Sequence, residues 1–149
     1  GEEFVRTLCH RYLIVRSAWV YGIGRDFVST VLNAAADPTC PWLAVPTDRF
    51  ASPTSADDLT AAVEQLIDHD TLGIYHIVCQ GRCSRYDFAQ AILKAAHMED
   101  KLELPPIRAA DAGSTPSYTV LDNLMLRLDN LPQPRPWKEA LNEYINSLQ

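Results

Sequence analysis

The chain has only six glycines in 149 residues, and none of them forms a Gly-x-Gly-x-x-Gly or Gly-x-x-Gly-x-x-Gly pattern. Such a pattern marks the turn that holds the diphosphate of a dinucleotide at a helix N-terminus. Its absence argues against a dinucleotide-binding loop within this sequence. A run of about 18 apolar residues and a charged-then-apolar leader are also missing, so we expect no membrane span, no secretory signal and a cytoplasmic location.

Positive charge is scarce as well, because 13 Lys and Arg residues stand against 19 Asp and Glu residues, giving a formal net charge of −6. The basic residues are scattered, whereas nucleic-acid binding needs Lys and Arg in clusters that neutralise phosphates. We therefore expect no nucleic-acid partner. An anionic small molecule would need a local pocket of positive charge.

The cysteines, Cys9, Cys40, Cys79 and Cys83, lack the spacing of a metal site. Only the last two are close, and they have neither the two-residue spacing of zinc knuckles nor a second ligand pair. We expect no metal site and interpret the thiols as reduced and mostly buried. The histidines are equally dispersed, and His76, inside an apolar run, is more typical of a core or strand-end histidine than of a catalyst.

Two apolar runs, 12–18 and 74–79, predict strands that are covered on both faces, as in a parallel sheet. Amphipathic helical spacing follows each of them. Asp26 and Ser84 stand at helix N-cap positions, and Thr54 or Ser55 begins a further capping pattern with an acid three residues later. The expected helices cover about 27–35, 56–68, 85–95 and 136–148, and residues 1–10 are spaced like the end of a longer helix.

The remaining segments give weaker signals. Residues 42–45 predict a short strand, and 109–119 predict a loop. Residues 102–107 predict an edge strand or a loop, because the two prolines lack donors. The alternation of strands and helices predicts one α/β domain, 1–149, with a partly parallel sheet. Two good strands are few, since a typical sheet has about five, so we expect the other strands of the sheet to lie elsewhere.

The turn after the first strand is the candidate ligand site. Residues 16–22 read Arg-Ser-Ala-Trp-Val-Tyr-Gly, which places two aromatic side chains and a flexible glycine at a strand end. In doubly wound sheets, ligands bind beyond the carboxyl ends of the strands. Arg16 ends a buried strand and therefore needs a partner for its charge, and we interpret it as a structural residue.

Several segments follow one another in a distinctive order. They are YLIVRSAWVYG (12–22), DFV (26–28), DRFASPTSADDL (48–59), GIYHI (73–77), YDFA (86–89) and LDN (121–123). In this order and spacing the chain resembles the dTDP-4-dehydrorhamnose reductases, of the extended short-chain dehydrogenase/reductase superfamily. The resemblance covers only the second half of such an enzyme. It implies the C-terminal part of a Rossmann-like doubly wound parallel sheet plus the small substrate-binding region.

The resemblance also implies where catalysis takes place. In that family the first half holds the glycine-rich loop and a Tyr-x-x-x-Lys pair, whose tyrosine protonates the developing alkoxide. The family's lysine is followed within a few residues by Gly-Glu, so the pair is expected just before Gly1. We expect no catalytic and no cofactor-binding residue in this chain. The complete enzyme would use NADPH or NADH, and neither is expected to bind this chain alone.

A nucleotide-sugar is the ligand that the resemblance implies, with Trp19, Tyr21, Arg49, Pro53 and Thr54 as candidate substrate-binding residues. The indole of Trp19 offers a flat apolar face to the C–H face of a deoxyhexose and one N–H donor; the alternative is a core tryptophan at a strand end. Arg49 could meet a diphosphate bidentately or remain a solvated surface charge. Pro53 and Thr54 would shape the wall of the crevice.

One departure concerns Thr115-Pro116, where the family usually has Arg-Pro before a Tyr-Ser-x-Leu segment. It leaves three functions open. The first is the substrate-binding portion of a dTDP-4-dehydrorhamnose reductase, which reduces the C4 ketone of dTDP-4-dehydro-L-rhamnose. The second is a non-catalytic regulatory or scaffolding relative, and the third is another nucleotide-sugar reductase or epimerase. The uncovered strand edge predicts self-association, or pairing with the missing N-terminal half.

Overall fold

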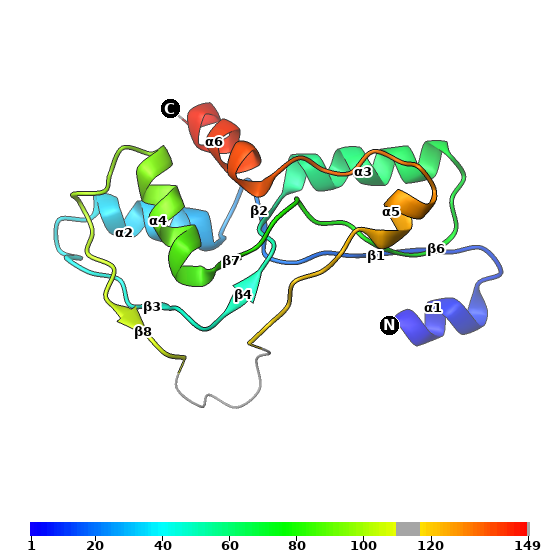
Figure 1. Ribbon diagram of the computed structural model, residues 1–149, viewed down its shortest axis with the longest axis horizontal. Coiled ribbons are helices and arrows are strands. Elements are labelled where there is room, and N and C mark those ends of the chain that lie inside the picture. Colours follow the sequence, from blue (N-terminus) through cyan, green and yellow to red (C-terminus); the bar gives the residue numbers. More distant parts are fainter. Residues whose placement is uncertain (110–116, 149) are drawn as a thin grey trace.

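The computed structural model describes residues 1–109 and 117–148, so the Thr115-Pro116 departure lies outside the described residues. The helices are α1 (Glu2–Leu8), α2 (Phe27–Ala36), α3 (Ala56–Asp68), α4 (Arg85–Ala95), α5 (Leu124–Leu128) and α6 (Trp137–Ser147). The strands are β1 (Leu13–Arg16), β2 (Val20–Tyr21), β3 (Val45–Pro46), β4 (Phe50–Ala51), β5 (Thr54–Ser55), β6 (Gly73–His76), β7 (Cys83–Ser84) and β8 (Pro106–Ile107). Figure 1 shows β1, β6, α3 and α5 at one end of the molecule and α2 and α4 at the other.

The strands β1 and β6 form a parallel pair, with Leu13 opposite Gly73 and Arg16 opposite His76. Because strand side chains alternate between faces, Leu13, Val15 and Tyr75 share one face, and there they pack with α3 and α5. Arg16, on the other face, forms an ion pair with Glu2 of α1. The expected carboxylate partner is therefore present, although Arg16 is exposed and not buried as the sequence suggested.

Both strands are shorter than the runs 12–18 and 74–79 that predicted them, and Ile14 and Tyr75 are their only buried residues. The expectation that both strands are covered on both faces is therefore wrong for the described residues. The reason is that α3 and α5 cover the Tyr75 face, while the opposite face is covered only in part: Ile14 is buried, Arg16 is exposed, and α1 buries none of its own residues.

The helix starts follow the predicted capping patterns. The Asp26 carboxylate accepts from the Ser29 N–H at 2.7 Å, and the Ser84 hydroxyl accepts from the Asp87 N–H at 3.0 Å, each within a reciprocal capping box. Of the two candidates for α3, Ser55 is the N-cap, and its hydroxyl accepts from the Asp57 and Asp58 N–H groups. These local hydrogen bonds satisfy N–H groups that have no partner inside the helix.

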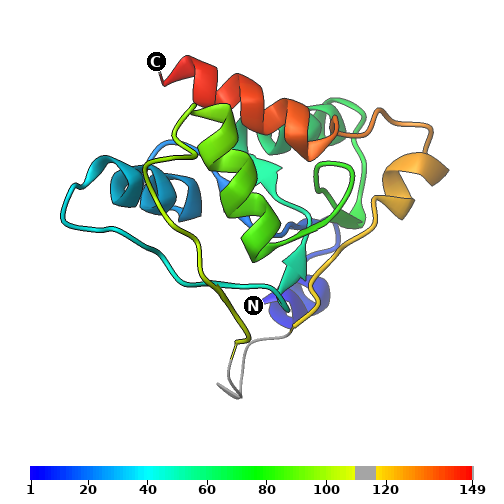
Figure 2. The ribbon, with the colours of Figure 1, turned by 60° about the vertical axis from the view of Figure 1, so that its left-hand side comes forward.

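The larger core lies among α2, α4 and α6, which Figure 2 shows packed beside one another. Phe88 of α4 is at its centre, 1% exposed. Its ring lies 5.8 Å from both Phe27 and Trp137, 5.7 Å from Tyr21 and 6.3 Å from Trp19, measured between centroids. Aromatic pairs at these separations add to the burial of apolar area, so Phe88 joins the start of α2 to the end of β1.

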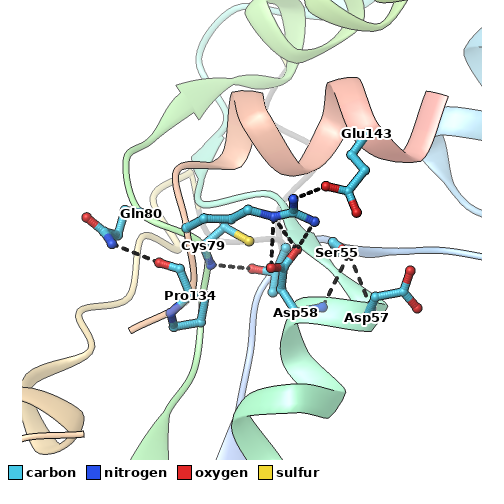
Figure 3. Close-up of polar contacts among 9 residues, drawn as sticks. Ser55, Asp57, Asp58, Cys79, Gln80, Pro134 and Glu143 are labelled. Carbon is cyan, nitrogen blue, oxygen red and sulfur yellow. Dashed lines mark hydrogen bonds and ion pairs between the residues drawn. The ribbon is translucent and has the colours of Figure 1, made fainter. Parts of the chain in front are cut away.

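A polar cluster holds α6 onto the start of α3. Asp58 of α3 and Glu143 of α6 both bind the guanidinium of Arg135, which precedes α6 (Figure 3). The charge of Arg135 lowers the pKa of the Glu143 carboxyl. From the next position of α6, the Tyr144 hydroxyl donates to the Gly22 carbonyl at 2.6 Å. These contacts fix the C-terminal helix over β2 and β5, which pair in parallel.

The weaker predictions are met in part. Of residues 42–45, Trp42 forms an isolated bridge to Glu103, and Val45 begins β3. β3 pairs in parallel with β8, within the segment that predicted an edge strand.

No helix of the described residues is long and apolar enough to cross a membrane.

Candidate functional site

A cleft of about 790 Å³ opens where β1 ends. Its walls come from the β1–β2 connection, the first residue of α2, the turn into β4, the first residue of α4 and the segment before α5. The lining residues are Ser17, Ala18, Trp19, Phe27, Pro46, Arg49, Phe50, Arg85, Thr119 and Leu121. The cleft therefore lies beyond the carboxyl end of a parallel strand, as expected for a ligand site in an α/β protein.

Trp19 holds an unusual backbone conformation on the cleft wall. Its φ is 42°, in the left-handed region that bulky residues rarely adopt. The ring is partly buried and packs on Phe88. A backbone strain of about 1–3 kcal/mol persists only where the surroundings enforce it, and such residues gather at functional sites. Because of this backbone conformation, the Trp19 side chain does not follow the alternating directions of side chains in a continuous strand.

Arg85 provides the main electrostatic feature of the cleft. Its guanidinium carbon lies 3.7 Å from the centroid of the Trp19 ring and 4.4 Å from that of Phe27. Burial against these rings lowers the pKa of Arg85 to about 10, so the side chain stays charged at neutral pH. Among the described residues, no carboxylate forms an ion pair with it.

The charged residues in the described lining of the cleft are both positive, although the protein is acidic. That described lining contains two charged residues, Arg49 and Arg85, and neither Asp nor Glu, although the formal net charge of the chain is −6. The Arg85 N–H also donates to the Arg49 carbonyl at 2.8 Å, which keeps the two backbones together. The Oγ atom of Ser17 is buried without a hydrogen-bond partner among the described residues. An anionic, partly apolar ligand fits this composition.

The sequence-predicted site residues separate into two groups. Trp19 and Arg49 line the cleft. Tyr21, Pro53 and Thr54 lie in the protein interior, outside that lining, and the Thr54 hydroxyl donates to the Ser52 carbonyl and accepts from the Cys79 N–H. Pro53 and Thr54 thus support the region behind the site. Direct substrate contact by any of the five residues stays a prediction.

Tyr21 is 2% exposed and packs between Phe88 and Tyr144. Burial raises the pKa of its hydroxyl, which has no hydrogen-bond partner among the described residues. In a continuous strand, Trp19 and Tyr21 would share a face. The left-handed backbone at Trp19 breaks this relation, so one ring lines the cleft and the other lies in the core.

The sequence prediction missed Phe27, Phe50 and Arg85. A signal for Arg85 was present, because this cation opens a helix directly after its N-cap Ser84, where the helix dipole disfavours positive charge. A residue placed against that preference points to a role beyond helix stability.

The cysteines have the predicted free thiols but differ in burial. Cys79 and Cys83 are buried, Cys40 is partly buried and Cys9 is exposed. Burial raises the pKa of Cys79 to about 11 and that of Cys83 to about 12. His76 ends β6, in agreement with its interpretation as a strand-end histidine.

Residues 1–149 match the family model described as the RmlD substrate binding domain. The chain belongs to this family. One relative of this RmlD substrate-binding domain is the spore coat polysaccharide biosynthesis protein SpsK of Bacillus subtilis, which is 37% identical over 147 residues, covering 97% of this chain and 50% of SpsK.

Two solved structures of dTDP-4-dehydrorhamnose reductases superpose on the whole RmlD substrate-binding domain. That from Clostridium acetobutylicum has a TM-score of 0.93 and 39% identity, with 53% of its chain covered. That from Bacillus anthracis, in complex with NADP, has a TM-score of 0.92 and 31% identity, with 52% covered. The resemblance to these reductases and the α/β fold with parallel strands are confirmed. The domain spans about half the length of the relatives it matches.

Proposed function

We propose that the chain is the substrate-binding portion of a dTDP-4-dehydrorhamnose reductase, the complete form of which reduces the C4 ketone of dTDP-4-dehydro-L-rhamnose. The observation that supports this proposal is the cleft at the end of β1, with the Trp19 ring and two arginines in its lining and no described acid. Apolar ring surface suits a deoxysugar, and guanidinium groups suit a diphosphate.

The reduction requires NADPH or NADH, which supplies the hydride when it is bound. The sequence has no glycine-rich diphosphate loop, so its residues do not fit that cofactor, and we assign the cofactor and the proton-donating tyrosine to a dinucleotide-binding half. The residues of this chain bind and orient the nucleotide-sugar. Phe88 keeps Trp19 and Phe27 in position beneath the cleft.

Titration calorimetry on the purified chain tests the proposal. We expect dTDP-L-rhamnose, the reaction product, to bind, and NADPH and NADH to bind far more weakly than they bind a complete reductase. Low-micromolar affinity of the chain alone for either cofactor would contradict the assignment of the cofactor to another half. Failure of dTDP-L-rhamnose to bind, or tighter binding of UDP-glucose, would favour the scaffolding relative or the reductase or epimerase of another nucleotide-sugar.

A kinetic test uses the chain joined to the dinucleotide-binding half of a family reductase. We expect the joined protein to oxidise NADPH when dTDP-4-dehydro-L-rhamnose is added, and the chain alone to show no turnover. If the joined protein folds and binds both ligands without turnover, the reductase assignment is wrong.

A further inference from the structure

Arg85 differs from the other arginines whose ionic contacts are described. Arg11, Arg16, Arg127 and Arg135 each form an ion pair with a carboxylate. Arg135, which is also partly buried, has both Asp58 and Glu143 as partners. The guanidinium of Arg85 lies over aromatic rings and forms no ion pair with a carboxylate among the described residues, although the sequence contains 19 acids.

The orientation of Arg85 determines which part of its side chain can bind a ligand. Its guanidinium stacks over the Trp19 ring, with Phe27 also close by. A guanidinium has its five N–H donors in its own plane, so stacking occupies a face and leaves the edge donors for an acceptor. Two parallel N–H groups match the spacing of two oxygens of a phosphate. No side-chain hydrogen bond of Arg85 to another described residue competes for these donors.

A charge withdrawn from water needs an opposite charge or strong hydrogen bonds to offset the lost hydration. Ring faces provide part of this stabilisation through their quadrupoles. Within the cleft, the described lining offers no carboxylate that could supply the rest. The counter-charge that the described residues do not provide is therefore best supplied by the ligand that fills the cleft.

We infer that Arg85 holds the diphosphate of the nucleotide-sugar with its guanidinium edge, while it stacks on Trp19. The inference rests on the proposed function and deepens it. It also revises how Trp19 is used: because Arg85 covers an indole face, the diphosphate and not the sugar is the part of the ligand nearest that face. Because the Trp19 ring also stacks on Phe88, the sugar then contacts Trp19 at its ring edge.

The test compares ligands that differ in charge, measured by titration calorimetry on the purified protein. The probes are thymidine, dTDP, dTDP-L-rhamnose and inorganic pyrophosphate. We expect wild-type protein to bind dTDP more tightly than thymidine, and Arg85→Gln to weaken dTDP binding by about 10- to 100-fold, the loss expected for charge-assisted hydrogen bonds. Thymidine binding should change little.

Two further variants separate charge from packing. Arg85→Lys keeps the positive charge without the planar fork, and we expect it to recover part of the dTDP affinity lost in Arg85→Gln. Arg11→Gln is the matched control, because it removes one positive charge from an exposed arginine outside the cleft lining. It should leave dTDP affinity unchanged, and thermal melting checks that every variant folds.

Each outcome supports or overturns the inference. Equal dTDP affinity of folded Arg85→Gln and wild-type protein would overturn it, while the proposed function would stand if dTDP-L-rhamnose still binds. Equal losses in Arg85→Gln and Arg11→Gln would also overturn it, since only the net charge would then matter. Loss of pyrophosphate binding in Arg85→Gln, with no preference for dTDP-L-rhamnose over UDP-glucose, would support the anion site and count against the proposed substrate.

Discussion

Gly22 allows the closest approach between the turn that carries Trp19 and helix α3. A Cβ atom at position 22 would lie 2.8 Å from the Cβ of Ala56. Non-bonded carbons prefer about 3.5–4.0 Å, so Gly22→Ala creates an overlap of roughly 1 Å. The sequence suggested a flexible glycine here, but Gly22 has no positive φ. The lack of space, and not backbone freedom, is what requires glycine.

The surroundings of Gly22 cannot yield easily. Its N–H donates to Asp26 at 2.8 Å, its carbonyl accepts from Tyr144, and the preceding residue pairs with Ser55, the N-cap of α3. We therefore expect the cost usual for overpacking, about 1–3 kcal/mol. In a domain of this size each kcal/mol lowers the melting temperature by about 2–4 °C.

A double-mutant cycle measured by urea unfolding tests the steric argument. Ala56→Gly removes the opposing methyl group at a cost of up to about 1 kcal/mol for the weaker helix former. In that background Gly22→Ala should cost almost nothing, which gives a coupling energy of about 1–3 kcal/mol. If Gly22→Ala destabilises both backgrounds equally, the overlap with Ala56 is not the reason for glycine.

Four further outcomes are expected. Trp19→Ala in the joined, active enzyme should raise KM or lower kcat/KM. Because the ring is only partly buried, the free energy of unfolding should fall by less than the roughly 3–5 kcal/mol expected for a core tryptophan. A collapse of the melting temperature would favour a purely structural role. Above pH 9.0, unfolded thiols ionise while burial keeps Cys79 and Cys83 protonated, so the urea midpoint should fall as the pH rises towards 11, and less steeply in Cys83→Ala. Asp26→Ala should cost about 1 kcal/mol in urea unfolding through loss of the α2 cap, and an unchanged midpoint would contradict this. Sedimentation should show self-association of the purified chain, and a single 16.7 kDa species at all concentrations would refute it.

The parts of the fold that depend on neighbours in the sequence were predictable. The N-caps Asp26 and Ser84 use side chains three residues apart, so the sequence alone contains both partners. Strand lengths were less predictable, because the pairing of residues 13–16 with 73–76 depends on what covers the strands. The apolar composition of a segment does not show whether another element packs on each face of the strand.

The candidate site divides in the same way. Trp19 could be proposed because it follows the first strand and lies in a recognisable segment. Arg85 lies 66 positions later in the chain, and its contact with the Trp19 ring arises only when α4 packs beside α2. Tyr21 shows the opposite case, because its ring lies in the core, two positions after the left-handed backbone at Trp19, and its contact with substrate stays a prediction.

Helix α1 has a consequence for amide hydrogen exchange. It is seven residues long, none of them buried, and Phe4 and Leu8 are 72% and 74% exposed. So short a helix is marginal in water without packing, and an exposed ion pair such as Glu2–Arg16 adds little to its stability. Its amides should therefore exchange almost as fast as those of an unstructured peptide. Slow exchange of the α1 amides would indicate that another surface packs on Phe4 and Leu8. Amide exchange in α1 therefore reports whether a partner is bound at this end of the domain.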